Sequence, residues 1–128
     1  MPGYETDFRQ LPFPEQTSPK LSFLVTDEDE VGLAAASLST LTMTLFDELS
    51  LAIINSRSNI DILNANNGTV DSSGNGTWVA APDDTKIQDE SLTEEVHIAM
   101  FRWTWQGGSR GGAWRVRHTV KNFAKIAS

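Results

Sequence analysis

The sequence contains no cysteine and only two histidines, His97 and His118. Without cysteine the chain can form neither a disulfide framework nor a thiolate metal site. Two histidines are also too few for a structural zinc site built on nitrogen and sulfur ligands. We therefore expect neither a bound metal ion nor a cofactor.

Long apolar runs are absent as well, since no uncharged apolar stretch reaches the roughly 20 residues that a membrane-spanning helix requires. The N-terminal residues lack the basic start and apolar core of a secretory signal, and they are too acidic for a transit peptide. The 128 residues, 39% hydrophobic and 21% charged, are typical of one soluble domain. We expect a soluble protein that is made in the cytoplasm, with no membrane partner.

Acidic residues are missing from the last quarter of the chain, because all 17 lie at or before Glu95. Four basic residues share that first part, whereas residues 96–128 carry six basic residues and no acidic one. An acidic body repels phosphate, so we expect the basic segment to pair with acidic groups of its own chain or of a neighbouring subunit. The charge pattern thus argues against a nucleic-acid partner.

Proline is nearly confined to the N-terminus, where four of the five prolines lie within the first 19 residues. Proline removes backbone donors and favours extended conformations, which argues against a helix or a central strand there. The sequence therefore predicts an extended arm at residues 1–19, followed by a domain at residues 20–128.

The arm carries large apolar side chains that lose favourable burial if they stay in water. They are Tyr4, Phe8, Leu11 and Phe13. They can pack on the body of the protein or dock on another chain. We expect the second, with a neighbouring subunit as the cover, because the domain has enough residues to close a core without the arm.

Alternation of apolar and polar residues predicts antiparallel strands in the first half of the domain. A strand at residues 20–26 ends at the acidic turn 27–32, and in LSTLTMTLF (38–46) threonines alternate with leucine and methionine. A helix across residues 33–54 is the competing interpretation, but the alternating threonines favour a strand. Residues 51–54 are then interpreted as the return strand of a hairpin.

The middle of the chain is dense in turn residues. Asn67-Gly68 and Asn75-Gly76 are predicted to be tight turns, with short strands at residues 69–70 and 77–79. Both asparagines also fit the Asn-x-Thr pattern of glycosylation acceptors. Without a secretory signal, the turn interpretation is preferred.

Two long strands are predicted near the C-terminus. EVHIAMFRWTW (95–105) is apolar on both faces for much of its length, so it should be a central strand. AWRVRHTVKNF (113–123) alternates, with one apolar face that includes His118. Its basic face supplies the residues that we expect to bind a partner together with the arm: Arg115, Arg117 and Lys121.

The connector between these strands contains GGSRG (107–111), which fits the Gly-x-Ser-x-Gly pattern around the nucleophilic serine of many hydrolases. That motif needs a strand leading into a helix and an acidic triad member further on, and no acidic residue follows Ser109. The overlapping Arg-Gly-Gly match is single and sits in an acidic protein, which argues against RNA binding. We expect residues 106–113 to be a hairpin loop.

Other acidic patterns fail as chemical sites. The turn that begins at Asp27 starts like a calcium loop, but Val31 and Leu38 stand where an EF-hand needs oxygen ligands. Glu94 and Glu95 are adjacent on a strand, so their side chains point to opposite faces. No catalytic residue is nominated, and we expect a protein that is not an enzyme.

The order of these segments resembles a known group of proteins. LSTLTMTLFDE, GTWVAAPDDT and the hairpin EVHIAMFRWTW-QGGSRGG-AWRVRHTVKN are similar in pattern to the immunoglobulin-like modules of tailed-phage virion proteins. The closest pattern is that of the N-terminal domain of siphophage upper baseplate proteins, over roughly residues 20–123. The resemblance implies a non-enzymatic adaptor that holds receptor-binding fibres on the particle. Those proteins continue into a fibre-binding region, and its absence here leaves a capsid decoration role open.

The sequence therefore predicts an all-β fold, an immunoglobulin-like antiparallel β-sandwich of about seven strands with an extended N-terminal arm. The resemblance implies a virion protein that contacts other virion proteins through the arm, as a homo-oligomer or part of a symmetric assembly. The alternative is a carbohydrate- or receptor-binding module with Trp103, Trp105 and Trp114 as a stacking platform. Core packing is the competing role for these indoles, and we favour it.

Overall fold

The computed structural model describes residues 5–123, except the side chains of residues 9–11. The strands of this part are β1 (Glu5–Pro14), β2 (Lys20–Leu24), β3 (Leu38–Asp47), β4 (Ile60–Asp61), β5 (Gly68–Val70), β6 (Asn75–Val79), β7 (Glu94–Trp105) and β8 (Arg110–Lys121). Two short 3-10 helices, η1 (Ala35–Ser37) and η2 (Pro82–Thr85), lie between strands. The predicted all-β fold class is confirmed. Within residues 5–123, no helix has the length and apolar character needed to cross a bilayer.

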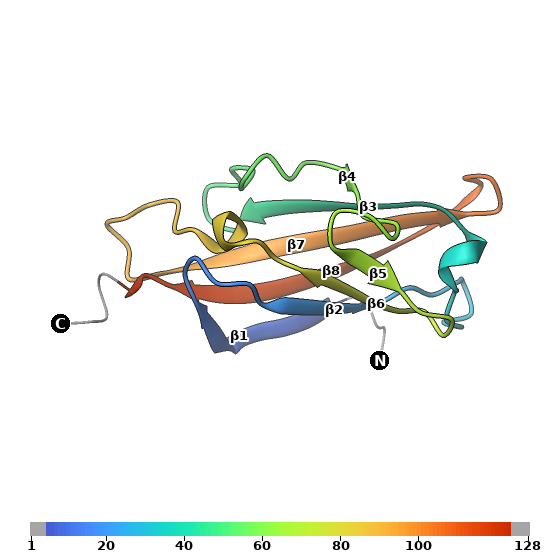
Figure 1. Cartoon of the computed structure of the whole chain (residues 1–128), viewed down its shortest axis with the longest axis horizontal. Helices are drawn as coiled ribbons and strands as arrows, with labels where there is room; N and C mark the ends of the chain where they lie inside the picture. The colour runs from blue at the N-terminus through green and yellow to red at the C-terminus, as the bar shows by residue number, and fades with distance from the viewer. Residues whose placement is uncertain (1–4, 124–128) are drawn as a thin grey trace.

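The strands form two sheets that pack face to face in a sandwich-like arrangement (Figure 1). The larger sheet has the order β1-β8-β7-β3-β4, and the smaller has the order β2-β6-β5. Every pairing is antiparallel except that of β1 with β8, which is parallel. The immunoglobulin-like detail of the fold stays a prediction.

The core lies between the two sheets and follows the alternation in the sequence. On β3, Leu41, Met43 and Leu45 point inward and are fully buried, because successive side chains of a strand point to opposite faces. The smaller sheet contributes Phe23, whose ring stacks on Phe101 of β7 at a centroid distance of 3.9 Å. The strand interpretation of LSTLTMTLF is therefore confirmed over the competing helix.

β7 is the middle strand of the larger sheet, as the sequence predicts. Its inner face carries buried aromatic side chains such as Phe101, and Ile98 on its outer face is buried too. β7 and β8 form a long antiparallel hairpin that runs along the long axis of the molecule (Figure 1). This hairpin is the frame on which the other elements lie.

The N-terminal segment forms the edge strand of the larger sheet. β1 runs parallel to β8, from the pair Glu5–Arg115 to the pair Pro14–Lys121, with a register shift between Phe8 and Phe13. Proline is tolerated at a sheet edge because one side of an edge strand needs no ladder hydrogen bonds. The arm is thus extended, as predicted, but it belongs to the same sheet as the C-terminal strands.

Residues 51–54 do not form the predicted return strand. The structure gives a loop with one isolated bridge, between Phe46 and Ile53, and the strand that pairs with β3 is β4. The backbone of Leu51 adopts a left-handed φ of 64°, which interrupts an extended run. Ile54 then turns into the core, where it is fully buried.

One of the two predicted tight turns also lies elsewhere. Asn75 and Gly76 are the first residues of β6, and the turn that precedes them spans residues 71–74. The Asp71 carboxylate accepts backbone N–H bonds from Ser73 and Asn75, and Gly74 has a positive φ of 87°. Because the Asp71 side chain accepts these hydrogen bonds, the turn forms before the Asn75-Gly76 dipeptide and not at it.

Candidate functional site

The Gly-rich connector is a hairpin turn, as predicted, with its tip at residues 106–109. Gln106, Gly107 and Gly108 all have positive φ values. The Ser109 hydroxyl donates a 2.8 Å hydrogen bond to the backbone carbonyl of Gln106. His118 lies nine residues further along β8, about 30 Å away for an extended strand, and it points into the core. Ser109 and His118 are therefore too far apart to act on each other.

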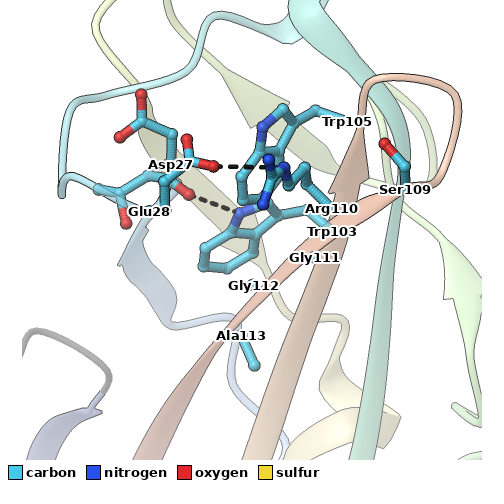
Figure 2. Close-up of a pocket in the computed structure, with 10 residues that line it drawn as sticks. Asp27, Glu28, Trp103, Trp105, Ser109, Arg110, Gly111, Gly112 and Ala113 are labelled. Carbon is cyan, nitrogen blue, oxygen red and sulfur yellow. Dashed lines mark hydrogen bonds and ion pairs between the residues drawn. The ribbon is translucent and has the colours of Figure 1, made fainter.

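A shallow hollow of about 390 Å³ lies beside this turn (Figure 2). Its walls are residues 26–28, which follow β2, and side chains of the β7–β8 hairpin. Arg110 and Glu28 form an ion pair across it at 3.4 Å, and both side chains are at least half exposed. An exposed pair of this kind adds little binding energy or stability because water screens it.

The three C-terminal tryptophans belong to the core. Trp103, Trp105 and Trp114 are only 2%, 6% and 7% exposed. The Trp103 indole N–H donates to the Thr26 carbonyl at 3.0 Å. The backbone of Gly112 packs so closely on the Trp103 ring that an added Cβ would lie 2.6 Å from its Nε1 atom. These indoles offer little free ring surface for stacking against a sugar.

The three basic residues that we expected to bind a partner lie on the outer face of β8, and each pairs within the chain. Arg115 contacts Glu5 of β1 at 2.6 Å, and Lys121 contacts Glu94 of β7. Arg117 forms an ion pair with Glu48, in the loop after β3. The basic strand is thus neutralised by acidic groups of its own chain.

Two of the four apolar residues of the arm are described by the structure with their side chains, Phe8 and Phe13. Both are half-buried and pack against the core of their own chain. Their rings contact each other with centroids 6.1 Å apart. Tyr4 and the side chain of Leu11 lie outside the described residues. For Phe8 and Phe13 the larger sheet supplies the cover that we expected from another subunit.

The loop after β3 presents aliphatic side chains to solvent, which the sequence analysis missed because it assigned a strand there. Leu49, Leu51 and Ile53 are 84%, 68% and 43% exposed. The loop is held by Asp47, whose carboxylate accepts bonds from the N–H and the hydroxyl of Ser50. We call residues 48–53 the apolar loop.

A buried polar cluster lies at the same end of the larger sheet, on its inner face. Asp47 of β3 is the direct partner of His97 in β7, and His97 is the partner of His118 in β8. Glu95 joins them, with its Oε1 atom 2.8 Å from His97 Nε2. Burial, followed by the electrostatic influence of the neighbouring His97, lowers the pKa of His118 to about 3.

Alternation in the sequence predicts that His118 lies on an apolar face, but it does not group His118 with the other three residues. Alternation puts Asp47 in line with the inward side chains of β3, and it puts Glu95 and His97 on one face of β7. Their meeting depends on the register among three strands. A local pattern carries no information on that register.

Comparisons with known proteins give no family assignment. No protein-family model, no curated protein and no solved structure matches this chain. The functional proposal therefore rests on the resemblance in sequence pattern to tailed-phage virion proteins and on the geometry of the chain's own residues.

Proposed function

We propose that this protein is a non-enzymatic structural component of a tailed-phage particle, an adaptor or decoration subunit that binds a repeated protein surface. The observation that carries the proposal is the position of β1 at the edge of the larger sheet. The outer side of β1 has no strand partner within residues 5–123. An unpaired edge can accept a strand from another chain, and proteins that leave such an edge exposed risk aggregation.

The charges next to this edge favour a protein partner over a nucleic acid. On the outer face of β8, Arg115 and Lys121 are neutralised by Glu5 and Glu94. Binding to nucleic acid depends on unpaired cations that replace counterions along the phosphates. A surface of alternating charge signs instead fits the polar rim of a protein interface.

The apolar loop supplies a second contact region. Leu49 and Leu51 extend from a loop whose backbone is fixed by bonds to Asp47, including one from Leu51 N to the Asp47 carbonyl. Large aliphatic side chains on a rigid loop lose little entropy when a partner covers them. Exposed apolar groups that gather in one place mark sites of protein contact.

The experiment is binding of the purified chain to particles of the phage that encodes it, produced without the gene for this chain. We expect saturable binding at a fixed copy number for each particle. Replacing Leu49 and Leu51 together by serine should weaken binding at least tenfold without a change in melting temperature. The control is Val31→Ser, which removes an aliphatic side chain of similar exposure at the other end of the sheet. Particles that are complete and infectious without the chain, and that do not bind it, would contradict the proposal.

A disulfide cross-link tests whether β1 stays paired with β8 when the chain binds to particles. The chain has no cysteine, so Glu5→Cys with Arg115→Cys gives one defined pair on neighbouring strands. We expect the oxidised protein to bind particles as well as the reduced protein does, since β1 binds while it stays paired with β8. Binding by the reduced form alone would mean that the N-terminal segment leaves β8 and docks on a neighbour.

A glycan array distinguishes the carbohydrate-binding alternative from the proposed structural role. We expect no glycan to bind, because the indole rings are covered. Glycan binding that Trp105→Ala abolishes in a still-folded protein would favour the alternative.

A further inference from the structure

The buried polar cluster contains a set of metal-ligating groups from different parts of the sequence. Asp47 ends β3, His97 lies opposite it on β7, and Glu95 precedes His97 on the same face. The exposed fractions of the three residues are 6%, 0% and 6%. One ligand atom from each residue lies within 4.8 Å of the other two. Three strong ligands therefore converge in the interior of the sandwich.

Outer hydrogen bonds hold both carboxylates in place. Glu95 accepts the backbone N–H groups of Gln88 and Asp89, at 2.8 and 2.7 Å, one on each oxygen. Asp47 accepts two bonds from Ser50 on its Oδ2 atom. A carboxylate oxygen has more than one lone pair, so each group keeps acceptor capacity for a cation. Ligating carboxylates in metal sites are oriented by outer bonds of this kind.

The two ring nitrogens of His97 have different surroundings. His97 Nε2 faces the Glu95 carboxylate at 2.8 Å, whereas His97 Nδ1 and His118 Nδ1 are buried and have no hydrogen-bond partner within residues 5–123. The two rings meet edge to face, with centroids 5.9 Å apart. A buried polar atom without a partner costs free energy, and it is rare in folded proteins. Because Nε2 is the His97 nitrogen next to the Glu95 carboxylate, it is the ring atom that can bind an ion in this site.

The charges of the two carboxylates also favour a bound cation. Two carboxylates in a low-dielectric interior repel each other unless a positive charge lies between them. A divalent cation offsets both carboxylates with His97 in its neutral, ligating form.

We propose that Asp47, Glu95 and His97 bind one divalent transition-metal ion of the zinc or manganese type. The mixture of one imidazole nitrogen with carboxylate oxygens suits these ions better than calcium, which takes oxygen ligands alone. The ion would tie the end of β3 to β7, and through Glu95 to the backbone at Gln88 and Asp89. The site is separate from the particle-binding role, and neither proposal depends on the other.

The acidic turn after β2 serves as an internal control. Asp27, Glu28 and Asp29 also bring carboxylates together, but Glu28 and Asp29 are exposed. The Asp27 Oδ1 atom is already bonded by the backbone N–H groups of Asp29 and Val31. This group has no buried nitrogen ligand, and exposed acidic clusters are common without a bound ion.

The first measurement uses the whole, unmodified chain after treatment with a chelator. Titration with Zn²⁺ should show one ion bound per chain and a higher melting temperature, because an ion that binds only the folded state stabilises it. Titration with Co²⁺ should give d–d absorption bands of a nitrogen-ligated ion, with the same stoichiometry. Absence of stoichiometric binding of both ions to the unmodified chain would overturn the proposal, and this result needs no variant.

Two substitutions then locate the ion. Glu95→Gln and Asp47→Asn keep the side-chain shape, and each should weaken Zn²⁺ binding at least tenfold. Asp29→Asn in the acidic turn should leave binding unchanged. Loss of binding in Asp29→Asn, with binding retained in Asp47→Asn, would overturn the proposal by moving the ion to the acidic turn. If Glu95→Gln does not fold, the comparison of Asp47→Asn with Asp29→Asn still decides between the two places.

Discussion

The ring of Phe13 in β1 lies against the imidazole of His118 in β8, with ring centroids 5.9 Å apart. This contact joins the Pro-rich N-terminal segment to the core of the larger sheet. The indole N–H of Trp114 donates to the Thr6 hydroxyl at 2.8 Å and provides a second tie between the same strands. β1 is therefore held by side-chain contacts near both of its ends.

Phe13→Ala should lower the free energy of unfolding by about 1–3 kcal/mol, because Phe13 is half-buried and a fully buried phenylalanine costs about 3–5 kcal/mol to truncate. Urea denaturation checks this value. Leu24→Ala removes a more exposed side chain from the outer face of the smaller sheet, and it should change stability by less than about 0.5 kcal/mol. Equal effects of the two substitutions would mean that β1 does not pack on the core.

His118 should make the protein less stable in acid. Its pKa is about 3 in the folded chain, against an ordinary value of 6.5, so the unfolded chain binds the extra proton over that interval. The free energy of unfolding should therefore fall as pH drops from 6.5 towards 3, by up to about 1.4 kcal/mol per pH unit from this group. Urea denaturation between pH 7 and 4 should give a shallower pH dependence for His118→Gln. Identical slopes for the variant and the unmodified chain would show that His118 is not buried in its neutral form.

Gly112→Ala and Gly111→Ala form a matched pair. A Cβ atom at Gly112 would lie 2.6 Å from the buried Trp103 ring, whereas one at Gly111 has its nearest neighbour at 3.5 Å. We expect Gly112→Ala to cost about 1–3 kcal/mol, as overpacking does, and Gly111→Ala to cost less than about 1 kcal/mol. Thermal unfolding followed by tryptophan fluorescence measures both. A neutral Gly112→Ala would mean that the Trp103 ring is free to move, as a ligand platform requires.

The ion pairs of Arg57 and Arg110 should differ in strength. The fully buried Asp84 carboxylate accepts hydrogen bonds from Arg57 and Asn55, both at 2.8 Å. Without Arg57, the buried negative charge of Asp84 would lose its positively charged partner. Arg57→Leu should therefore cost about 3 kcal/mol. Arg110→Leu removes only an exposed pair and should cost less than about 1 kcal/mol. Chemical denaturation of the two variants gives the comparison, and equal costs would contradict the burial of the Asp84 pair.

Much of the fold could be predicted because alternation is a local property. The inward positions of β3 and the hairpin of β7 with β8 follow from the period of two and from the glycines between the strands. The loop at residues 51–54 could not be predicted, since its composition suits a strand, whereas the left-handed φ values of Leu51, Asn55 and Ser56 interrupt the extended backbone on both sides of it. The parallel pairing of β1 with β8 joins the two ends of the sequence, and no local pattern encodes such a pairing.

The candidate sites were less predictable than the fold. The charge asymmetry led to the expectation that Arg115 and Lys121 have acidic partners, and the structure finds these partners within the chain. The cluster of Asp47, Glu95 and His97 needed the register of β3 against β7. The sequence reveals the residue types of a site, whereas their distances come from non-local pairing.

The most direct test of the proposed role is a cryo-electron microscopy reconstruction of the tailed-phage particle to which we propose that this chain belongs. We expect density for the sandwich in several symmetry-related copies, with β1 paired to β8 of the same chain. Either the outer edge of β1 or the apolar loop should contact another particle protein. A complete particle without any copy of the chain, while the chain remains unbound in the lysate, would contradict the structural role.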